Sequence, residues 1–320
     1  MNEQAQRKAQ ARAMLGAILS LMFVAMWGVT SAWAQGTMKL QQVAHNTWYV
    51  QGESALGSSA NRNFISNAGF VITPAGVVVV DALGSPALAQ ELIALIRQRT
   101  SLPITHVLVT HYHADHIYGL QAFEGAQIWA HDAGKEYLNS ETAQSRLAAS
   151  REEMFPWVDD KTRLVSATRW LHTRTELVVG GVTFVLQPMG PAHTPEDLVV
   201  YVPAEAVLFS GDLVFRGRIP FVGHANSRQW LQALQTMLSF EARTVVPGHG
   251  PASQQARQDM QLTYDYLAYL RQSMGQAAKD MVPFEEAYAQ TNWQRFEHLP
   301  LFKAANRMNA YNTYLEMERE

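Results

Sequence analysis

The sequence contains no cysteine in its 320 residues. That absence excludes a disulfide-stapled fold, cysteine-based zinc fingers, iron–sulfur clusters and a cysteine nucleophile. Charged residues are also few, at 17%, and the formal net charge is −3. Because the chain lacks the basic excess that binds phosphate backbones, we expect no nucleic-acid partner. Apolar residues are plentiful, at 48%, which predicts a substantial buried core.

The N-terminus has the features of an export signal. Three basic residues, Arg7, Lys8 and Arg12, precede a long uncharged and strongly apolar stretch, and an Ala-x-Ala pattern follows at residues 32–34. We predict a secretory signal peptide over 1–34, and hence an exported, periplasmic protein without membrane attachment after cleavage. The alternative is an uncleaved anchor, because the uncharged stretch is nearly long enough to span a bilayer.

Short apolar runs alternate with segments whose apolar residues recur at helical spacing, and turn residues separate the two. The predicted strands cover residues 46–51, 63–71, 77–80, 104–110, 128–130, 176–179, 182–187, 198–202, 206–210 and 244–246. The predicted helices cover residues 86–99, 133–138, 145–154, 230–238, 260–274 and 301–317. Strands that alternate with helices and hairpins predict a layered α/β architecture. Residues 141–174 are expected to form a surface excursion over a site.

Histidine and aspartate side chains gather at the ends of the predicted strands. One cluster occupies six residues directly after a predicted buried strand, and it consists of His111, His113, Asp115 and His116. Three further members each follow a strand close to glycine, which lets the backbone approach an ion, and these are His193, Asp212 and His249. Imidazole nitrogens and carboxylate oxygens are good zinc ligands. The sequence therefore predicts a metal site.

The order of these seven residues resembles the metallo-β-lactamase superfamily, over about residues 41–253. The resemblance implies an α/β fold, the four-layered αββα sandwich, with two Zn²⁺ ions per chain. It assigns one zinc to His111, His113 and His193, the second to Asp115, His116 and His249, and a bridging position to Asp212. Asp81, at the end of a predicted strand, is expected to orient a ligand or its loop rather than bind metal.

The resemblance also implies a domain organisation and a mechanism. We divide the chain into the signal peptide (1–34), a hydrolase domain (35–253) and a C-terminal helical extension (254–320) packed on that domain. Two zinc ions about 3.5–4 Å apart can share a hydroxide at neutral pH, which attacks the substrate. Asp115 is the predicted catalytic residue, since it can orient that hydroxide and move a proton.

The bridging residue narrows the expected function. β-Lactamases of this fold usually carry Cys or Ser where this chain has Asp212, whereas glyoxalase II-like hydrolases carry Asp. We therefore expect an exported zinc-dependent hydrolase of a small-molecule ester, thioester or lactone. The alternatives are a β-lactamase, an iron-dependent sulfur dioxygenase and a non-catalytic metal-binding periplasmic accessory. Nitrogen and oxygen ligands would also accept iron or manganese in place of zinc.

Two segments, 217–223 and 299–311, are similar to exported metallohydrolases of the quinoprotein-relay type. For the second segment, plain helix packing is the alternative to a role in substrate binding. The candidates for the wall of a substrate pocket are Phe155, Trp157, Phe221 and His224, and for each of them the alternative is packing in the core or on the surface. The oligomeric state does not follow from the sequence.

Overall fold

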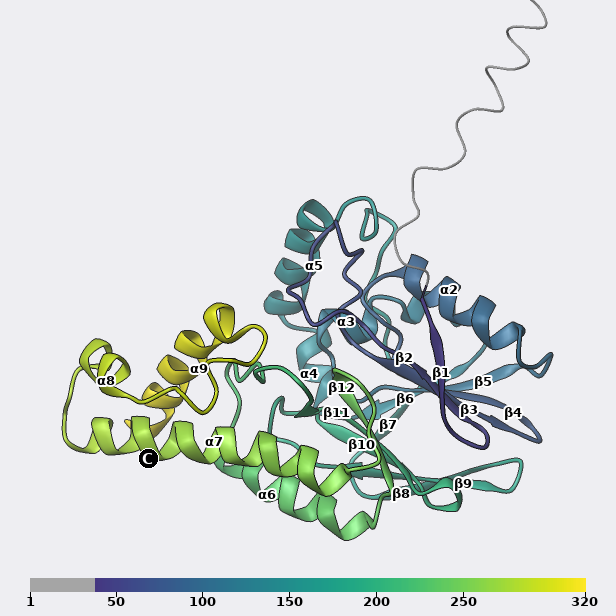
Figure 1. Ribbon diagram of the computed structural model, residues 1–320. Helices are drawn as coiled ribbons and strands as arrows, with labels where there is room; N and C mark the ends of the chain where they lie inside the picture. The colour runs from purple at the N-terminus through teal and green to yellow at the C-terminus, as the bar shows by residue number, and fades with distance from the viewer. Residues whose placement is uncertain (1–37) are drawn as a thin grey trace, which may run out of the picture. The chain divides into compact units, whose positions relative to one another are not determined.

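Two β-sheets lie face to face in the part of the chain that the structure describes, which is residues 38–320 of a computed structural model (Figure 1). The signal peptide predicted over 1–34 lies outside these residues. Within 38–320, no helix combines the length and the apolar character that crossing a membrane requires.

The first sheet has seven strands in the order β1-β2-β3-β4-β5-β6-β7. Neighbours are antiparallel from β1 to β4 and parallel from β4 to β7. The strands are β1 (Leu40–Ala44), β2 (Thr47–Val50), β3 (Ala68–Thr73), β4 (Gly76–Val80), β5 (Ile104–Leu108), β6 (Gln127–His131) and β7 (Arg169–Leu171). Because β4 and β5 are parallel, the segments that follow them leave the sheet at the same edge, where open α/β sheets commonly bind ligands.

The second sheet has five strands in the order β12-β11-β10-β9-β8. Only the pair β11 and β12 is parallel in it. The strands are β8 (Thr175–Val179), β9 (Val182–Pro188), β10 (Leu198–Val202), β11 (Val207–Phe215) and β12 (Thr244–His249). Strands β8 and β9 form the predicted hairpin, with Gly180 and Gly181 between them at positive φ.

Strand β4 shows how the two sheets are held together. Each residue of its Val77–Val80 run is at most 2% exposed. Val78 and Val80 belong to the core between the sheets, together with Phe184 of β9. Val77 and Val79 belong to the core on the outer side of the first sheet. Both faces of the strand are covered, which is why an uninterrupted apolar run is stable there.

Helices cover the outer faces of both sheets. Helix α2 (Pro86–Arg97) packs on the first sheet, with Ser85 capping its first turn. The shorter α3 (Ala114–Ile117), α4 (Gly134–Leu138) and α5 (Glu141–Glu153) follow, together with a 3-10 turn η1 (Leu120–Ala122). Helices α6 (Ser227–Met237) and α7 (Ala256–Lys279) cover the second sheet, and α8 (Phe284–Gln290) and α9 (Phe302–Met317) pack on α7 (Figure 1).

This arrangement confirms the predicted αββα sandwich with C-terminal helices. The division at residue 253 stays a prediction, although α7 shares its core with the second sheet. The short elements β1, β7 and α8 were not predicted. The predicted strand at 63–71 is wrong over 63–67, because Asn63 has a φ of 58° that no strand contains. Strand β11 continues to Phe215, five residues past its predicted end, because its pairing with β12 extends that far.

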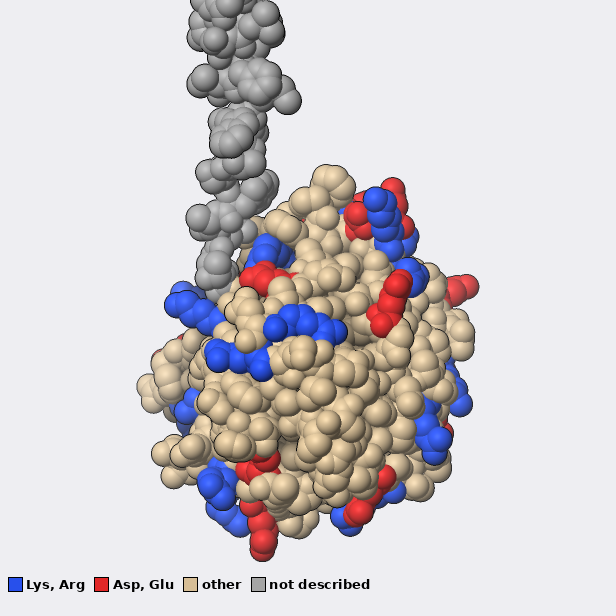
Figure 2. All heavy atoms as spheres, turned by 90° about the vertical axis from the view of Figure 1, so that its right-hand side faces the viewer, with Lys and Arg blue, Asp and Glu red and all other residues tan. Residues whose placement is uncertain are grey.

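Charged side chains are sparse on the surface, in line with the composition. On the face shown in Figure 2, Lys, Arg, Asp and Glu side chains stand among wide areas of other residues, and both signs occur. The Lys and Arg side chains on this face lie closest together in its upper left part, beside an acidic group.

Candidate metal centre

The seven predicted His and Asp residues converge at the edge where strands of both sheets end. His111 and His113 follow β5, and Asp115 and His116 lie on α3. The remaining three come from the second sheet: His193 precedes β10, Asp212 lies within β11, and His249 ends β12. The structure assembles two groups whose ligand atoms lie within 4.8 Å of one another, namely His111, His113, His193 and Asp212, and then Asp115, His116 and His249.

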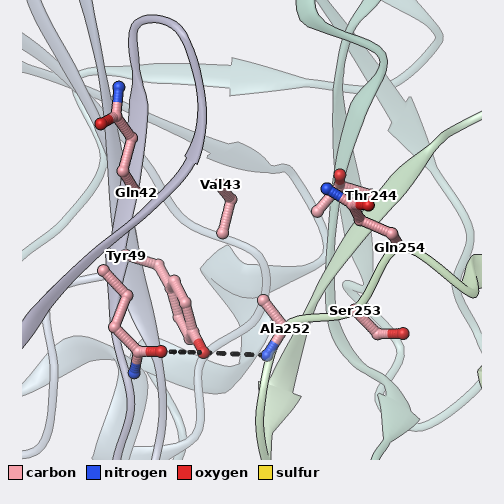
Figure 3. Close-up of a pocket in the computed structure, with 8 residues that line it drawn as sticks. Gln42, Val43, Tyr49, Thr244, Ala252, Ser253 and Gln254 are labelled. Carbon is pink, nitrogen blue, oxygen red and sulfur yellow. Dashed lines mark hydrogen bonds between the residues drawn. The ribbon is translucent and has the colours of Figure 1, made fainter.

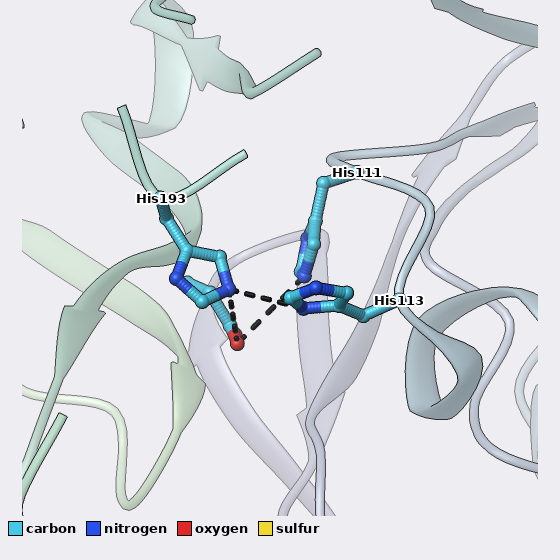
Figure 4. Close-up of side chains that lie close together, drawn as sticks. His111, His113 and His193 are labelled. Atoms are coloured by element: carbon cyan, nitrogen blue, oxygen red, sulfur yellow. Dashed lines mark hydrogen bonds and ion pairs between the residues drawn. The ribbon is translucent and has the colours of Figure 1, made fainter. Parts of the chain in front are cut away.

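In the first group the imidazole rings are directed toward one another (Figure 4). His193 Nε2 lies 3.0 Å from His113 Nδ1. Asp212 Oδ2 lies 3.4 Å from His193 Nε2 and 3.7 Å from His111 Nε2. Three side chains from two sheets thus present nitrogen atoms around one carboxylate oxygen.

Asp212 also reaches the second group. Its Oδ2 lies 3.3 Å from His249 Nε2, and its Oδ1 lies 3.2 Å from His116 Nε2. Strand β12 can come this close because residue 248 is glycine: a Cβ there would lie 2.0 Å from Asp212 Oδ1. Asp212 therefore stands between the two groups, and the family resemblance implies a bridging role for it.

The donor atoms fit divalent cations. Three buried polar atoms have no hydrogen-bond partner within the described residues, namely His111 Nε2, His116 Nε2 and Asp212 Oδ1. Burying such atoms is unfavourable unless a bound ligand or ion interacts with them. His249 Nδ1 lies 2.7 Å from the Ile65 carbonyl oxygen and must donate to it. His249 Nε2 therefore carries a lone pair toward the site, as metal ligation requires.

Asp81 occupies the position behind His116. Its Oδ2 accepts hydrogen bonds from His116 Nδ1 at 2.8 Å and from Thr110 Oγ1 at 2.8 Å, and its Oδ1 accepts from the Thr110 backbone N–H at 2.8 Å. Thr110 Oγ1 in turn lies 3.1 Å from His111 Nδ1 and can accept a hydrogen bond from it. Asp81 thus contacts both a candidate ligand and the loop that carries the others.

The electrostatics of the cluster favour positive charge at its centre. Burial lowers the pKa of His113 to about 3 and that of His111 well below its usual value, so both rings are neutral donors. Burial opposes ionisation of Asp212, yet His249, His116 and His111 hold its pKa well below the usual range. The pKa of His116 is raised well above normal against the effect of burial, because the carboxylates around it stabilise a cation.

A cavity of about 550 Å³ opens onto the first group, at His113 and His193. One wall comes from α4 and α5 and contains Tyr137 and Arg146, and the other comes from the segment after β11 and from α9. Phe221 and His224, two of the four predicted pocket residues, line this second wall. The cavity therefore lies between elements that are far apart in the sequence.

The other two predicted pocket residues lie elsewhere. Phe155 and Trp157 are not among the residues that line this cavity. Both contact a loop between β2 and β3: the Ser59 hydroxyl donates to the Phe155 carbonyl oxygen, and Trp157 Nε1 donates to the Ser59 carbonyl oxygen at 2.9 Å. Their aromatic character alone did not reveal this packing.

Sequence reasoning also missed residues that the structure places at the site. Arg218 is 5% exposed and stacks on Phe215, whose ring lies parallel to that of His249. Burial lowers the pKa of Arg218, while the nearby carboxylates of Asp212 and Asp115 favour its charged form. The only signal for Arg218 was its place in the segment 217–223. Arg146 carried no signal, because it lies on a helix with little apolar periodicity.

A second, smaller cavity of about 210 Å³ lies at the junction of β1, β2 and the segment after β12. Figure 3 shows the Tyr49 hydroxyl there, which accepts a hydrogen bond from the Ala252 backbone N–H at 3.0 Å. Among the residues that the structure describes, no acidic, basic or histidine side chain lines this cavity. It therefore offers little chemistry of its own, and the larger cavity is the candidate substrate site.

Comparison with known proteins gives the same family as the geometry. A family model described as the metallo-beta-lactamase superfamily matches residues 61–249. The metallo-beta-lactamase type 2 of Bacillus sp. (strain 170) is 29% identical over 220 residues, which are 67% of this chain and 77% of that protein. The linear primary-alkylsulfatase of Pseudomonas sp. (strain ATCC 19151) is 22% identical over 253 residues, which are 66% of this chain and 47% of that protein.

A solved structure shows the same fold over a larger share of the chain. The stereoselective inverting sec-alkylsulfatase Pisa1 from Pseudomonas sp. matches with a TM-score of 0.68 at 18% identity, over 87% of this chain and 50% of that one. The family match, its hydrolase relatives and the fold agree with the clustered His and Asp ligand atoms. The chain therefore belongs to the metallo-beta-lactamase superfamily of hydrolases.

Proposed function

We propose that this protein is an exported zinc-dependent hydrolase of an ester, thioester or lactone. The observation that carries the proposal is the position of Asp212, which lies within 3.7 Å of histidine nitrogens from both groups. A carboxylate shared by both groups suits a pair of cations. By the family resemblance, Asp at position 212 is typical of glyoxalase II-like hydrolases, whereas β-lactamases of this fold usually carry Cys or Ser there.

The two groups would hold one metal ion each, with Asp212 between them. When bound, the ions would lower the pKa of water to about 7 and polarise the substrate oxygen. Asp115 is the candidate for the proton transfer, because its side chain is 15% exposed whereas that of His116 is fully buried. The Ser66 hydroxyl donates to the Asp115 carbonyl oxygen and fixes the backbone that presents the carboxylate.

The second candidate function is β-lactam hydrolysis. It is favoured by the similarity to a metallo-beta-lactamase over 77% of that relative. The two functions need the same attack on a carbonyl carbon and differ in the leaving group, which is an amide nitrogen rather than an oxygen or a sulfur. The ligand residues cannot separate them, so substrates must.

The test is a substrate panel on the mature protein after loading with zinc. We expect hydrolysis of p-nitrophenyl esters, thioesters or lactones to exceed turnover of a chromogenic β-lactam, and a chelator to abolish it reversibly. Lactam turnover at the ester rate would support the second function instead. Protein that binds no zinc and is unaffected by chelator would overturn both, and iron with oxygen uptake on a persulfide would indicate a dioxygenase.

Export is tested separately. We expect the periplasmic fraction to contain a protein whose N-terminus is Gln35, as measured by mass spectrometry of the intact chain. Retention of residues 1–34 in a membrane fraction would instead support the anchor alternative.

A further inference from the structure

The two segments that the sequence singled out, 217–223 and 299–311, pack against each other at the cavity. Asn309 of α9 makes two hydrogen bonds to the backbone on either side of Phe221: its Nδ2 donates to the Pro220 carbonyl oxygen at 2.7 Å, and its Oδ1 accepts from the Val222 backbone N–H at 3.0 Å. One buried amide on the C-terminal helix thus fixes the backbone that presents a cavity residue.

Asn309 is itself held rigidly. Its side chain is 0% exposed, and its Nδ2 also donates to the Tyr266 hydroxyl at 2.9 Å. That hydroxyl donates in turn to Asn306 Oδ1 at 2.8 Å. A buried network in which each member finds a partner is stiff and specifies one arrangement. The position of α9 relative to the 217–223 segment is therefore well defined.

Further contacts fix both ends of α9. Before the helix, the Ile219 backbone N–H donates to the Pro300 carbonyl oxygen at 3.0 Å. Near its C-terminus, Glu316 accepts hydrogen bonds from the backbone N–H and the hydroxyl of Ser227, at the start of α6. The cavity wall therefore belongs to the folded body of the protein rather than to a loose tail.

This wall presents apolar side chains to the cavity. Phe221 is 41% exposed and Met308 is 52% exposed, although both are large and apolar, and both line the cavity that reaches His113 and His193. Exposed apolar side chains that border a cavity are typical of a surface that binds the apolar part of a ligand. The opposite wall, with Arg146 and Tyr137, is more polar.

We propose that α9 builds the specificity wall of the substrate site. In this arrangement Phe221 and Met308 receive an apolar acyl or alkyl group of the substrate, and Asn309 is a positioning residue that holds Phe221 in place. The inference rests on the proposed hydrolase function for its kinetic test, and it names the substrate class more closely: an ester, thioester or lactone that carries a hydrocarbon chain.

The test is a series of straight-chain p-nitrophenyl esters from acetate to octanoate. A methylene that is fully removed from water contributes about fourfold to affinity, and on a half-exposed wall we expect about twofold per methylene in kcat/KM. Met308→Ser should flatten this dependence, because kcat/KM falls by a larger factor for octanoate than for acetate. Met281→Ser is the matched control, because Met281 is 87% exposed and does not line the cavity.

Asn309→Ala should raise KM for the long esters, and the factor of this rise should exceed the factor by which kcat for acetate falls. Its control is Thr313→Val, which removes a buried hydrogen bond within α9, from the Thr313 hydroxyl to the Asn309 carbonyl oxygen, without touching residues 217–223. A chain-length dependence that is equally steep in wild type, Met308→Ser and Asn309→Ala would overturn the inference, and so would an equal loss on all esters.

The design separates this inference from the proposed function. If the wild-type protein hydrolyses no ester, thioester or lactone, the proposed function fails, while the wall can still be tested by calorimetric binding of hexanoate, octanoate and decanoate. Affinity that rises with chain length in wild type and in Met281→Ser, but not in Met308→Ser, would support the wall. Affinity that is independent of chain length would overturn it.

Discussion

Replacing Asp81 with asparagine should weaken one metal site and spare the other. Asp81 Oδ2 accepts a hydrogen bond from His116 Nδ1 at 2.8 Å, so Nε2 is the nitrogen that faces the centre and that binds a metal ion once it gives up its own proton. The substitution keeps the size of the side chain. It also suits the backbone, because Asp81 has a φ of 61°, a conformation that Asn adopts readily.

The expected magnitude follows from the hydrogen bonds. An amide can still accept from the Thr110 backbone N–H through its oxygen, but its NH₂ group then faces His116 Nδ1, which is itself a donor. His116 must lose this bond or move its proton to Nε2, where it blocks ligation. A hydrogen bond to a charged group contributes about 1.5–3 kcal/mol, which agrees with the loss of about 10- to 100-fold in metal affinity expected on removing such a partner.

Zinc titration in competition with a chromophoric chelator measures this effect, because it resolves two affinities. We expect Asp81→Asn to weaken one site by about 10- to 100-fold and to leave the other within about twofold. Asp259→Asn is a matched control, since Asp259 is also buried but its carboxylate pairs with Arg216 rather than with a candidate metal ligand. Two unchanged affinities, or an equal loss at both sites in folded protein, would refute the reasoning.

Three further predictions address the bridge, the core and the cavity. Asp212→Ala should leave fewer than two zinc ions per chain by elemental analysis and reduce hydrolysis by at least about 100-fold; two retained ions would contradict it. Trp230→Ala removes a side chain that is 0% exposed and hydrogen-bonded to the Leu213 carbonyl oxygen. The free energy of unfolding in denaturant should fall by about 3–5 kcal/mol, and a decrease below about 1 kcal/mol would be inconsistent with this packing. Arg146→Gln removes the one Lys or Arg that lines the cavity within residues 38–320. It should raise KM about two- to fivefold for an ester with a carboxylate, but not for a neutral one.

The strands and turns near the candidate ligands could be predicted from the sequence, because apolar runs and turn residues occur together there. The Val77–Val80 run predicts a strand covered on both faces, and Gly180 with Gly181 predicts a hairpin turn, so both appear close to where they were expected. The seven clustered His and Asp residues all follow or lie within such strands. Strong periodicity and turn residues act over a few positions, which is the range that a sequence displays directly.

The cavity could not be predicted in the same way. Its walls come from α4, α5, the segment after β11 and α9, and side chains such as Arg146 and Met308 have no local feature that distinguishes them from other surface residues. The aromatic residues Phe155 and Trp157 carried the expected chemistry, yet their partner is Ser59, almost a hundred residues earlier in the chain. Which residues share a cavity depends on packing between distant elements.

This difference explains why the metal chemistry is easier to infer than the substrate. Two candidate ligands are held by contacts behind them, His116 by Asp81 and His249 by the Ile65 carbonyl oxygen. A substitution at any of these positions disturbs the set of donor atoms. The residue types are therefore constrained to His and Asp, which can be recognised in the sequence. The cavity walls bear no such constraint on residue type: Asn309 must fit the backbone beside Phe221, but the side chains that face the substrate can vary while the fold and the ligands stay the same. We therefore expect substitutions in the cavity walls, on α5, on α9 and in the segment after β11, to change substrate choice while the metal centre keeps its donor set.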